Sequence, residues 1–288
     1  MTTAGCHLVA VAAIGITAGA AAAGESQSAL VAPLRSILVR AAAYVERFER
    51  EFALVVSDES YRQQLGSGPW QLLPRDRVRH TRAEMVFLWM PDEGLWLNAR
   101  NVLSVDGAPV PASAARVGEA LSDPSGRIDR LTRIRADSVR YNLGDIFRDF
   151  NDPTFTLQFV AARLQPRFRW QLESREQQNG LEVARIAFSE RASPTLVRRG
   201  TVDLISRGTI WIESATGVVR RTSLAVDDPL LQTRGRVDVE FGPVSRIDVR
   251  VPLAMDERYT QARTFILARA TYSNFRRFET SGRLMSPP

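Results

Sequence analysis

The chain has 288 residues, with 38 basic and 32 acidic side chains, and every basic residue is an arginine. The absence of lysine excludes a P-loop and every lysine-based covalent mechanism. A net charge of +6 over this length argues against nucleic acid as a partner.

The N-terminus has the layout of a secretory signal peptide. Leu8–Ala23 is an uncharged run of small and apolar residues that is short for a membrane span. It ends in alanines, with small residues at the candidate cleavage positions. We therefore expect residues 1–24 to be a signal peptide and residues 25–288 to form a single soluble domain. The place of action is then the periplasm or another extracytoplasmic compartment.

Removal of the leader would also remove the cysteine and one of the two histidines. Cys6 is the only cysteine of the chain, and His80 would be the only histidine left. A zinc site of cysteine and histidine is therefore excluded, and we expect no metal and no cofactor. No GxSxG or GxGxxG motif occurs. The adjacent acids Asp227-Asp228 and Asp256-Glu257 are interpreted as surface charge, so we expect no enzyme and no catalytic residue.

The first half of the chain predicts a helix followed by strands. Pro33–Glu51 carries an apolar stripe at three- and four-residue spacing, which is typical of an amphipathic helix packed on a sheet. Strands are expected at 52–63, 79–90 and 95–105. Because Met85–Met90 is apolar on both faces, the second strand should be covered on both sides. Residues 113–141 predict the only other helical region, broken at 123–126.

The second half reads almost entirely as antiparallel strand. Expected strands cover Phe155–Phe159, residues 168–172, 181–189, 209–213, 218–226, 236–241, 246–251 and 263–279. Asn179-Gly180 indicates a type I′ hairpin turn. Strict alternation of polar and apolar residues predicts a large antiparallel sheet with one wet and one buried face. The sequence therefore predicts one α+β domain with about ten strands and two or three helices.

One hairpin resembles a known family. Gly208–Thr222 is similar to the G-x-x-W-I-D-x-x-T-G-x-x-x-R hairpin of outer-membrane lipoprotein-sorting proteins, the LolA/LolB-like periplasmic carriers. Ala41–Phe48 and Ala270–Phe278 resemble an uncharacterised bacterial branch near that group. The resemblance implies a curved half-barrel with helices packed on its concave face and an apolar cavity that holds acyl chains.

The candidate site residues follow from this expectation. Large apolar side chains on the strands would line the cavity: Met85, Phe87, Trp89, Trp96, Phe155, Phe159, Trp170 and Trp211. The alternative is that these side chains pack against the N-terminal helix. A basic stretch beside His80 is a candidate site for an anionic headgroup: Arg75, Arg77, Arg79 and Arg82. Its alternative is a solvated strand edge.

Three functions remain open on the sequence. The favoured one is a non-enzymatic binding protein for a lipid, a lipidated protein or another apolar ligand. The second is an envelope protein-interaction or sensing module on the same scaffold, which a large exposed apolar patch would favour. The third and least favoured is a carboxylate-based hydrolase, which needs two facing acidic side chains in a cleft.

Overall fold

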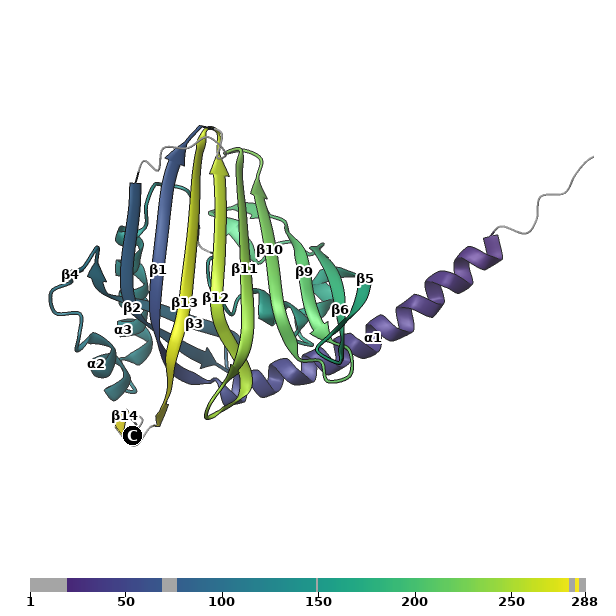
Figure 1. Ribbon diagram of the computed structural model, residues 1–288, viewed down its shortest axis with the longest axis horizontal. Coiled ribbons are helices and arrows are strands. Elements are labelled where there is room, and N and C mark those ends of the chain that lie inside the picture. Colours follow the sequence, from purple (N-terminus) through teal and green to yellow (C-terminus); the bar gives the residue numbers. More distant parts are fainter. Residues whose placement is uncertain (1–19, 69–76, 149, 280–282, 285–288) are drawn as a thin grey trace, which may run out of the picture.

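A large antiparallel sheet dominates the computed structural model, which describes residues 20–68, 77–148, 150–279 and 283–284. Eleven strands follow one another in the order β4-β3-β2-β1-β13-β12-β11-β10-β9-β6-β5, and β14 pairs with β13 off this path (Figure 1). Every strand pair is antiparallel, as the alternating sequence predicts. The strands are β1 (Leu54–Ser67), β2 (Arg77–Met90), β3 (Leu95–Val105), β4 (Ala108–Pro109), β5 (Phe168–Gln178), β6 (Leu181–Glu190), β9 (Ser206–Glu213), β10 (Val219–Asp228), β11 (Thr233–Val244), β12 (Ile247–Gln261), β13 (Thr264–Glu279) and β14 (Arg283–Leu284).

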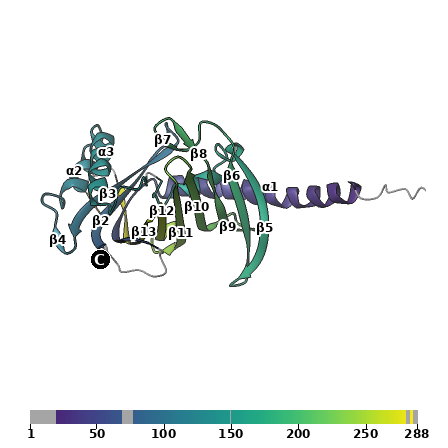
Figure 2. The same cartoon turned by 90° about the horizontal axis from the view of Figure 1, so that it is seen from above.

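The sheet is curved and is not closed into a barrel. Figure 2 shows it bending, with β2 and β3 at one end and β5 and β6 at the other. A separate two-stranded sheet is formed by β7 (Val197–Arg199) and β8 (Val202–Leu204). The α+β class and the curved half-barrel expected from the sequence are confirmed.

Three α-helices accompany the sheet: α1 (Ala20–Glu51), α2 (Arg116–Ser122) and α3 (Arg127–Ser138). The helix predicted from Pro33 is confirmed but begins at Ala20, because residues 20–32 are rich in alanine, the best helix former. The predicted break at 123–126 separates α2 from α3. Residues 1–19 of the expected signal peptide lie outside the described residues. Within the described part of the chain, no helix is both long and apolar enough to cross a membrane.

The strand expected at Phe155–Phe159 is wrong. Thr156–Val160 form a 3₁₀-helix, η2, with η1 (Val139–Tyr141) before it and η3 (Gln165–Arg167) after it. The Asp152 carboxylate accepts the backbone N–H of Thr154 at 2.7 Å, which forms an Asx-type turn ahead of η2. Pro153 follows Asp152, and the turn that Asp-Pro favours outweighs the alternation of Phe155, Leu157 and Phe159.

The main core lies between α1, η2 and the inner face of the sheet. Ile37, Ala41, Val45 and Phe48 of α1 are all buried there. They pack together with inward-facing residues of β1, β2, β3 and of most strands between β13 and β5. The apolar stripe read from the sequence is thus the face of α1 that covers the sheet.

A second, smaller core lies on the other face of β1, β2 and β3. Val86 and Leu88 of β2 pack there against Leu131 and Ile134 of α3. Met85 and Phe87 belong to the main core, so β2 is covered on both faces as predicted. The helix α3 packs beside β3, near the sheet edge.

The hairpin turn between β9 and β10 holds α1 in place. The Arg40 guanidinium donates to the Ser214 carbonyl at 2.8 Å. Gly217 has φ +76°, and a Cβ built on it would lie 2.2 Å from the Arg40 carbonyl carbon. A Cβ at Gly208 would lie 1.9 Å from the Ser223 carbonyl oxygen. Both glycines of the Gly208–Thr222 hairpin therefore permit close backbone approach, which is a structural role.

Candidate functional site

Three hollows of the molecule share one residue, Arg135 of α3. An apolar hollow has a volume of about 550 Å³ and a polar hollow about 510 Å³. A small hollow of about 50 Å³ shares Arg135 and Asp152 with the apolar one and Arg135, Arg100 and Asn151 with the polar one. The shared lining residues make the three hollows a connected candidate site.

Aromatic and aliphatic side chains line the apolar hollow. Trp96 comes from β3, Phe155 and Phe159 from the η2 region, and Leu164 and Leu196 from the segments around it. The rings of Phe155 and Phe159 pack edge to face with centroids 5.1 Å apart. The polar side chains that line the hollow are Glu93, Arg135, Asp152, Gln158 and Arg198. A mostly apolar lining with a few polar groups is the usual composition of a small-molecule site.

Side-chain hydrogen bonds fix the wall of the apolar hollow. Asn98 of β3 donates to the Asp152 carboxylate and, at 2.8 Å, to the Thr154 hydroxyl. Trp96 lies two residues before Asn98, on the same face of β3, because side chains alternate along a strand. The start of η2 and the inner face of β3 are therefore tied together beside Trp96.

Four arginines line the polar hollow: Arg100, Arg135, Arg140 and Arg148. The remaining polar side chains there are Ser138, Asn142, Asn151 and one exposed acid, Asp145. Arg148 is 4% exposed and donates to Gln63 Oε1 at 3.1 Å and to the Leu143 carbonyl at 2.9 Å. The hollow is therefore rich in hydrogen-bond donors and positive charge.

Arg100 is held by a buried ion pair. Its guanidinium donates to both carboxylate oxygens of Glu59, and both side chains are almost fully buried. Burial acts to lower the pKa of Arg100, but the Glu59 carboxylate outweighs it, so that pKa lies above its usual value. The guanidinium also stands over the Tyr61 ring, 4.5 Å from its centroid. Arg100 is thus charged and fixed in orientation.

A layer of buried phenols and one carboxyl lies on the inner face of the sheet. The Tyr259 hydroxyl donates to Glu257 at 2.8 Å. Burial raises the pKa of Glu257 and raises the pKa values of Tyr61, Tyr259 and Tyr272 well above their usual range. The three phenols are therefore neutral at physiological pH and supply no nucleophile.

The adjacent acids noted in the sequence do not form facing pairs. Asp227 binds Arg207, while Asp228 binds Arg199 and caps the Leu230 backbone N–H. Asp256 binds Arg269 on the outer face, whereas Glu257 is buried on the inner face. Neighbouring strand residues point to opposite faces, so each acid has its own surroundings. Among the described residues, no group of three or more His, Cys, Asp or Glu could hold a metal ion.

Seven of the eight apolar candidates lie in the main core. Met85, Phe87, Trp96 and Phe159 are buried members, and Trp89, Phe155 and Trp170 pack against the core while partly exposed. Of these, Trp96, Phe155 and Phe159 line the apolar hollow. Phe87 packs on Phe52 at a centroid distance of 4.9 Å, and Trp89 packs on Trp96 at 5.3 Å. Most candidates therefore pack against neighbours, as the alternative reading proposed.

Trp211 does not join the other seven. Ile210 and Ile212 on either side of it are core residues, so alternation turns Trp211 to the outer face. Its ring lies 5.0 Å from the Arg221 guanidinium and 5.9 Å from that of Arg185. Trp211 therefore does not line the apolar hollow.

Of the four arginines proposed for an anionic headgroup, Arg75 lies outside the described residues, and the other three do not share one face of β2. Arg77 and Arg79 are two residues apart and lie on one face, and Arg79 donates to the Tyr141 carbonyl at 3.1 Å. Arg82 is an odd number of residues from both, so it points to the opposite face, where it pairs across the sheet with Ser60.

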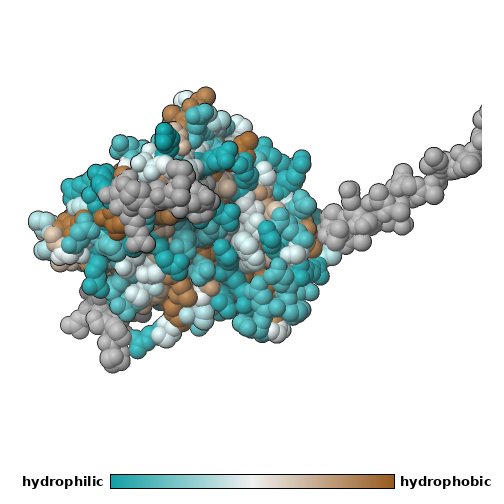
Figure 3. Space-filling model, turned by 45° about the horizontal axis from the view of Figure 1, so that its top comes forward, coloured by the Kyte–Doolittle hydropathy of each residue, from teal (hydrophilic) through white to brown (hydrophobic). Residues whose placement is uncertain are grey.

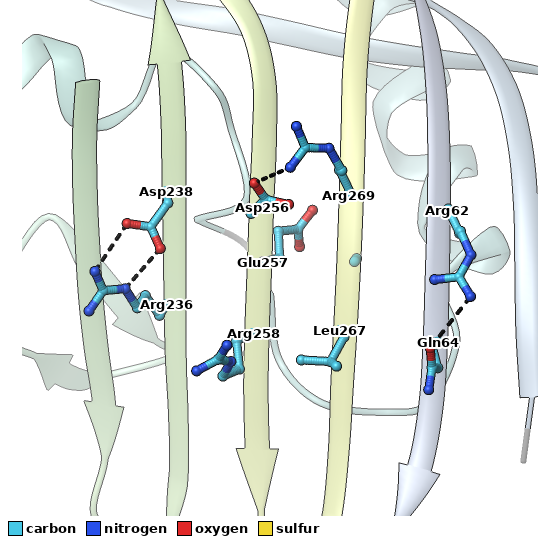
Figure 4. A pocket seen from close by; sticks show the side chains of 10 residues that line it. Arg62, Gln64, Arg236, Asp238, Asp256, Glu257, Arg258, Leu267 and Arg269 are labelled. Atoms are coloured by element: carbon cyan, nitrogen blue, oxygen red, sulfur yellow. Dashed lines mark hydrogen bonds and ion pairs between the residues drawn. The ribbon is translucent and has the colours of Figure 1, made fainter. Parts of the chain in front are cut away.

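The outer face carries a further hollow of about 510 Å³ over β1, β13, β12 and β11. Figure 4 shows its charged side chains, with Arg236 bound to Asp238 and Arg269 bound to Asp256. The first pair lies within β11 and the second joins β13 to β12, and exposed ion pairs of both kinds are typical of a solvated sheet face. On the side of the molecule seen in Figure 3, apolar residues are scattered among hydrophilic ones.

The sequence did not single out the arginines of the polar hollow. A signal was present for two of them. Arg100 stands in β3 at an inward position between Asn98 and Val102, and Arg148 directly follows the apolar pair Ile146-Phe147. A charge at an apolar position requires a partner and marks a constrained site.

No protein-family model matches the chain, and no curated protein matches it in sequence. Three solved structures are similar to it, each at 10% sequence identity. A LolA superfamily protein from Nitrosomonas europaea has a TM-score of 0.34 and covers 88% of this chain and 94% of its own. A DUF1329 family protein from Desulfovibrio piger has a TM-score of 0.37, with 86% and 94% covered.

The third structure is a domain assigned to outer membrane lipoprotein sorting, from Vibrio parahaemolyticus. Its TM-score is 0.32, with 84% of this chain and 94% of that chain covered. Similarity of this extent says nothing about what the chain binds, so its function has to be inferred from its own residues.

Proposed function

We propose that this chain is a non-enzymatic binding protein that holds the apolar part of a ligand in the apolar hollow. The observation that carries the proposal is the convergence of Trp96, Phe155, Phe159, Leu164 and Leu196 on one space of about 550 Å³. Ligand sites typically have volumes of about 300–1,000 Å³ and apolar walls. Each methylene group buried there would contribute about 0.8 kcal/mol, so an acyl chain is a suitable occupant.

The surroundings of the hollow support binding without chemistry. Of the two acids that line it, Asp152 is engaged by Asn98 and Thr154. Glu93, the other acid, is exposed. An acid–base pair of the glycosidase kind needs two carboxyl groups with different surroundings on either side of a substrate. The walls therefore fit a carrier or sensor of an apolar ligand better than a hydrolase.

The test uses N-phenyl-1-naphthylamine, an uncharged fluorophore that brightens in apolar surroundings. The wild-type protein should bind it saturably with about one-to-one stoichiometry. Phe155→Glu should weaken binding more than about tenfold, because a charge would be placed against the bound apolar group. Phe155 is only partly buried, so the variant should remain folded, which circular dichroism checks.

Leu230→Glu is the matched control, because Leu230 is 69% exposed and lies outside the hollow. Its affinity for the fluorophore should equal that of the wild type. Absence of saturable binding to the wild type would overturn the proposal. So would a folded Phe155→Glu protein that binds as tightly as the Leu230→Glu protein.

We also propose that the protein acts in the periplasm or another extracytoplasmic compartment after loss of residues 1–24. The proposal rests on the uncharged run Leu8–Ala23 and its alanine-rich end. N-terminal sequencing of protein from an envelope extract should give a start near Gly24 or Glu25. An intact Met1 on the extracted protein, or lipid attached to Cys6, would contradict it.

A further inference from the structure

We infer that the polar hollow binds the anionic head of the same ligand, a carboxylate or a phosphate, so that the ligand is an anionic amphiphile. This inference rests on the proposed binding of an apolar group in the neighbouring hollow. It assigns the headgroup to α3 and the segment after it, and not to the arginines of β2.

Charge in the polar hollow is unbalanced. Four guanidinium groups line it against one lining carboxylate, that of Asp145. The charge of Arg100 is neutralised by its buried ion pair with Glu59. Arg148 donates to an amide oxygen and a carbonyl, neither of which carries charge, and burial raises the pKa of Glu257, the carboxyl group with which Arg148 interacts. Within the described residues, the hollow therefore keeps a surplus of positive charge.

Two of the four guanidinium groups are available to a ligand. Arg140 stacks on the Tyr141 ring at 4.9 Å, and Arg135 forms no side-chain interaction with any other described residue. Arginine presents a planar fork of donors that matches carboxylate and phosphate oxygens. Arg135 and Arg140 are thus suited to meet an anion that enters from solvent.

A buried donor points to an acceptor that is not supplied by the protein. The side-chain amide nitrogen of Asn151 is buried and has no hydrogen-bond partner among the described residues. Asn151 lines both the polar hollow and the small hollow beside it. Buried polar groups are normally hydrogen-bonded, and an unpaired donor there is satisfied by an anionic oxygen from a bound headgroup.

The position of Arg135 joins the two halves of the ligand. It lines the polar, the small and the apolar hollow, so its guanidinium stands where a head and a tail would meet. A fatty acid or a phospholipid has this arrangement of one anionic group next to an apolar chain. A free phosphate has the head alone, and the two sources are separated by the experiment.

The experiment compares ligands that share a tail and differ in charge. Oleate and oleyl alcohol displace N-phenyl-1-naphthylamine from the wild-type protein at low ionic strength. Oleate should bind at least about tenfold more tightly, the order expected for a charge-assisted hydrogen bond. The double variant Arg135→Gln/Arg140→Gln should lose this preference for oleate and bind oleyl alcohol unchanged. Arg133→Gln, an exposed position of α3 outside all three hollows, should keep it.

Equal binding of oleate and oleyl alcohol to the wild type would overturn the inference while leaving the proposed function intact. A preference that survives in the double variant would also overturn it. If the wild-type protein binds neither the fluorophore nor either oleyl compound, the proposed function fails, and calorimetry with glycerol 3-phosphate tests the anion site alone. If the wild-type protein binds glycerol 3-phosphate and the double variant does not, the polar hollow is a site for a free anion. If the wild-type protein does not bind glycerol 3-phosphate, the anion site is overturned.

Discussion

Replacing Gly217 by alanine should lower the free energy of unfolding by about 2–5 kcal/mol. Gly217 has φ +76°, a left-handed conformation that costs a residue with a Cβ about 1–2 kcal/mol. The new Cβ would also lie 2.2 Å from the Arg40 carbonyl carbon and 2.5 Å from the Ala41 nitrogen. These are backbone atoms of α1, so relief requires movement of the helix, which costs about 1–3 kcal/mol in a packed core.

Gly180→Ala separates the two contributions. Gly180 has φ +78°, and a Cβ built on it meets nothing within 4 Å. Its alanine variant should therefore lose only the conformational part, about 1–2 kcal/mol. Both variants are unfolded in urea and followed by tryptophan fluorescence and circular dichroism, with unchanged slopes expected for a two-state transition. Equal losses in the two variants would refute the direct seating of α1 on the β9–β10 turn.

Two further predictions concern the buried ionisable groups. Burial raises the pKa of Glu257, so its contribution to stability is complete below the unfolded value of about 4.3 and is lost as the pH rises through the raised folded value. Glu257→Gln should remove this decline in the free energy of unfolding and stabilise the protein near neutral pH by on the order of 1 kcal/mol. Urea titrations from pH 4 to 8 measure it. An equal decline of the free energy of unfolding in both proteins would contradict the prediction. Arg100→Met leaves the Glu59 carboxylate buried without its partner. It should lower the free energy of unfolding by about 3–5 kcal/mol. The double variant Arg100→Met/Glu59→Leu should recover most of that loss in thermal melts, and a double variant as unstable as the single one would argue against the pair.

The sequence by itself determined the elements and the class of fold. The stripe of Ile37, Ala41, Val45 and Phe48 fixed which face of α1 is buried, because helical period and apolar spacing coincide. Alternation fixed most of the strands, because side chains of a strand point to two faces in turn. Met85–Met90 showed in advance that β2 is covered on both faces. The strand expected at Phe155–Phe159 was wrong because alternation over five residues is a weaker signal than the turn that Asp152-Pro153 favours just before it.

Only the tertiary structure decided which residues meet. Trp211 and Trp96 were both predicted to line the cavity as large apolar side chains on strands. The register of β9 turns Trp211 outward, whereas the register of β3 turns Trp96 into the apolar hollow. Arg100, Arg135 and Arg148 come from a strand, a helix and a loop, and no local pattern relates them. Local propensity and alternation act over a few neighbouring residues, whereas a binding site depends on contacts between segments far apart in the chain. The polar hollow and its surplus of charge therefore arise only when α3, β3, residues 142–148 and Asn151 are brought together by packing on the sheet.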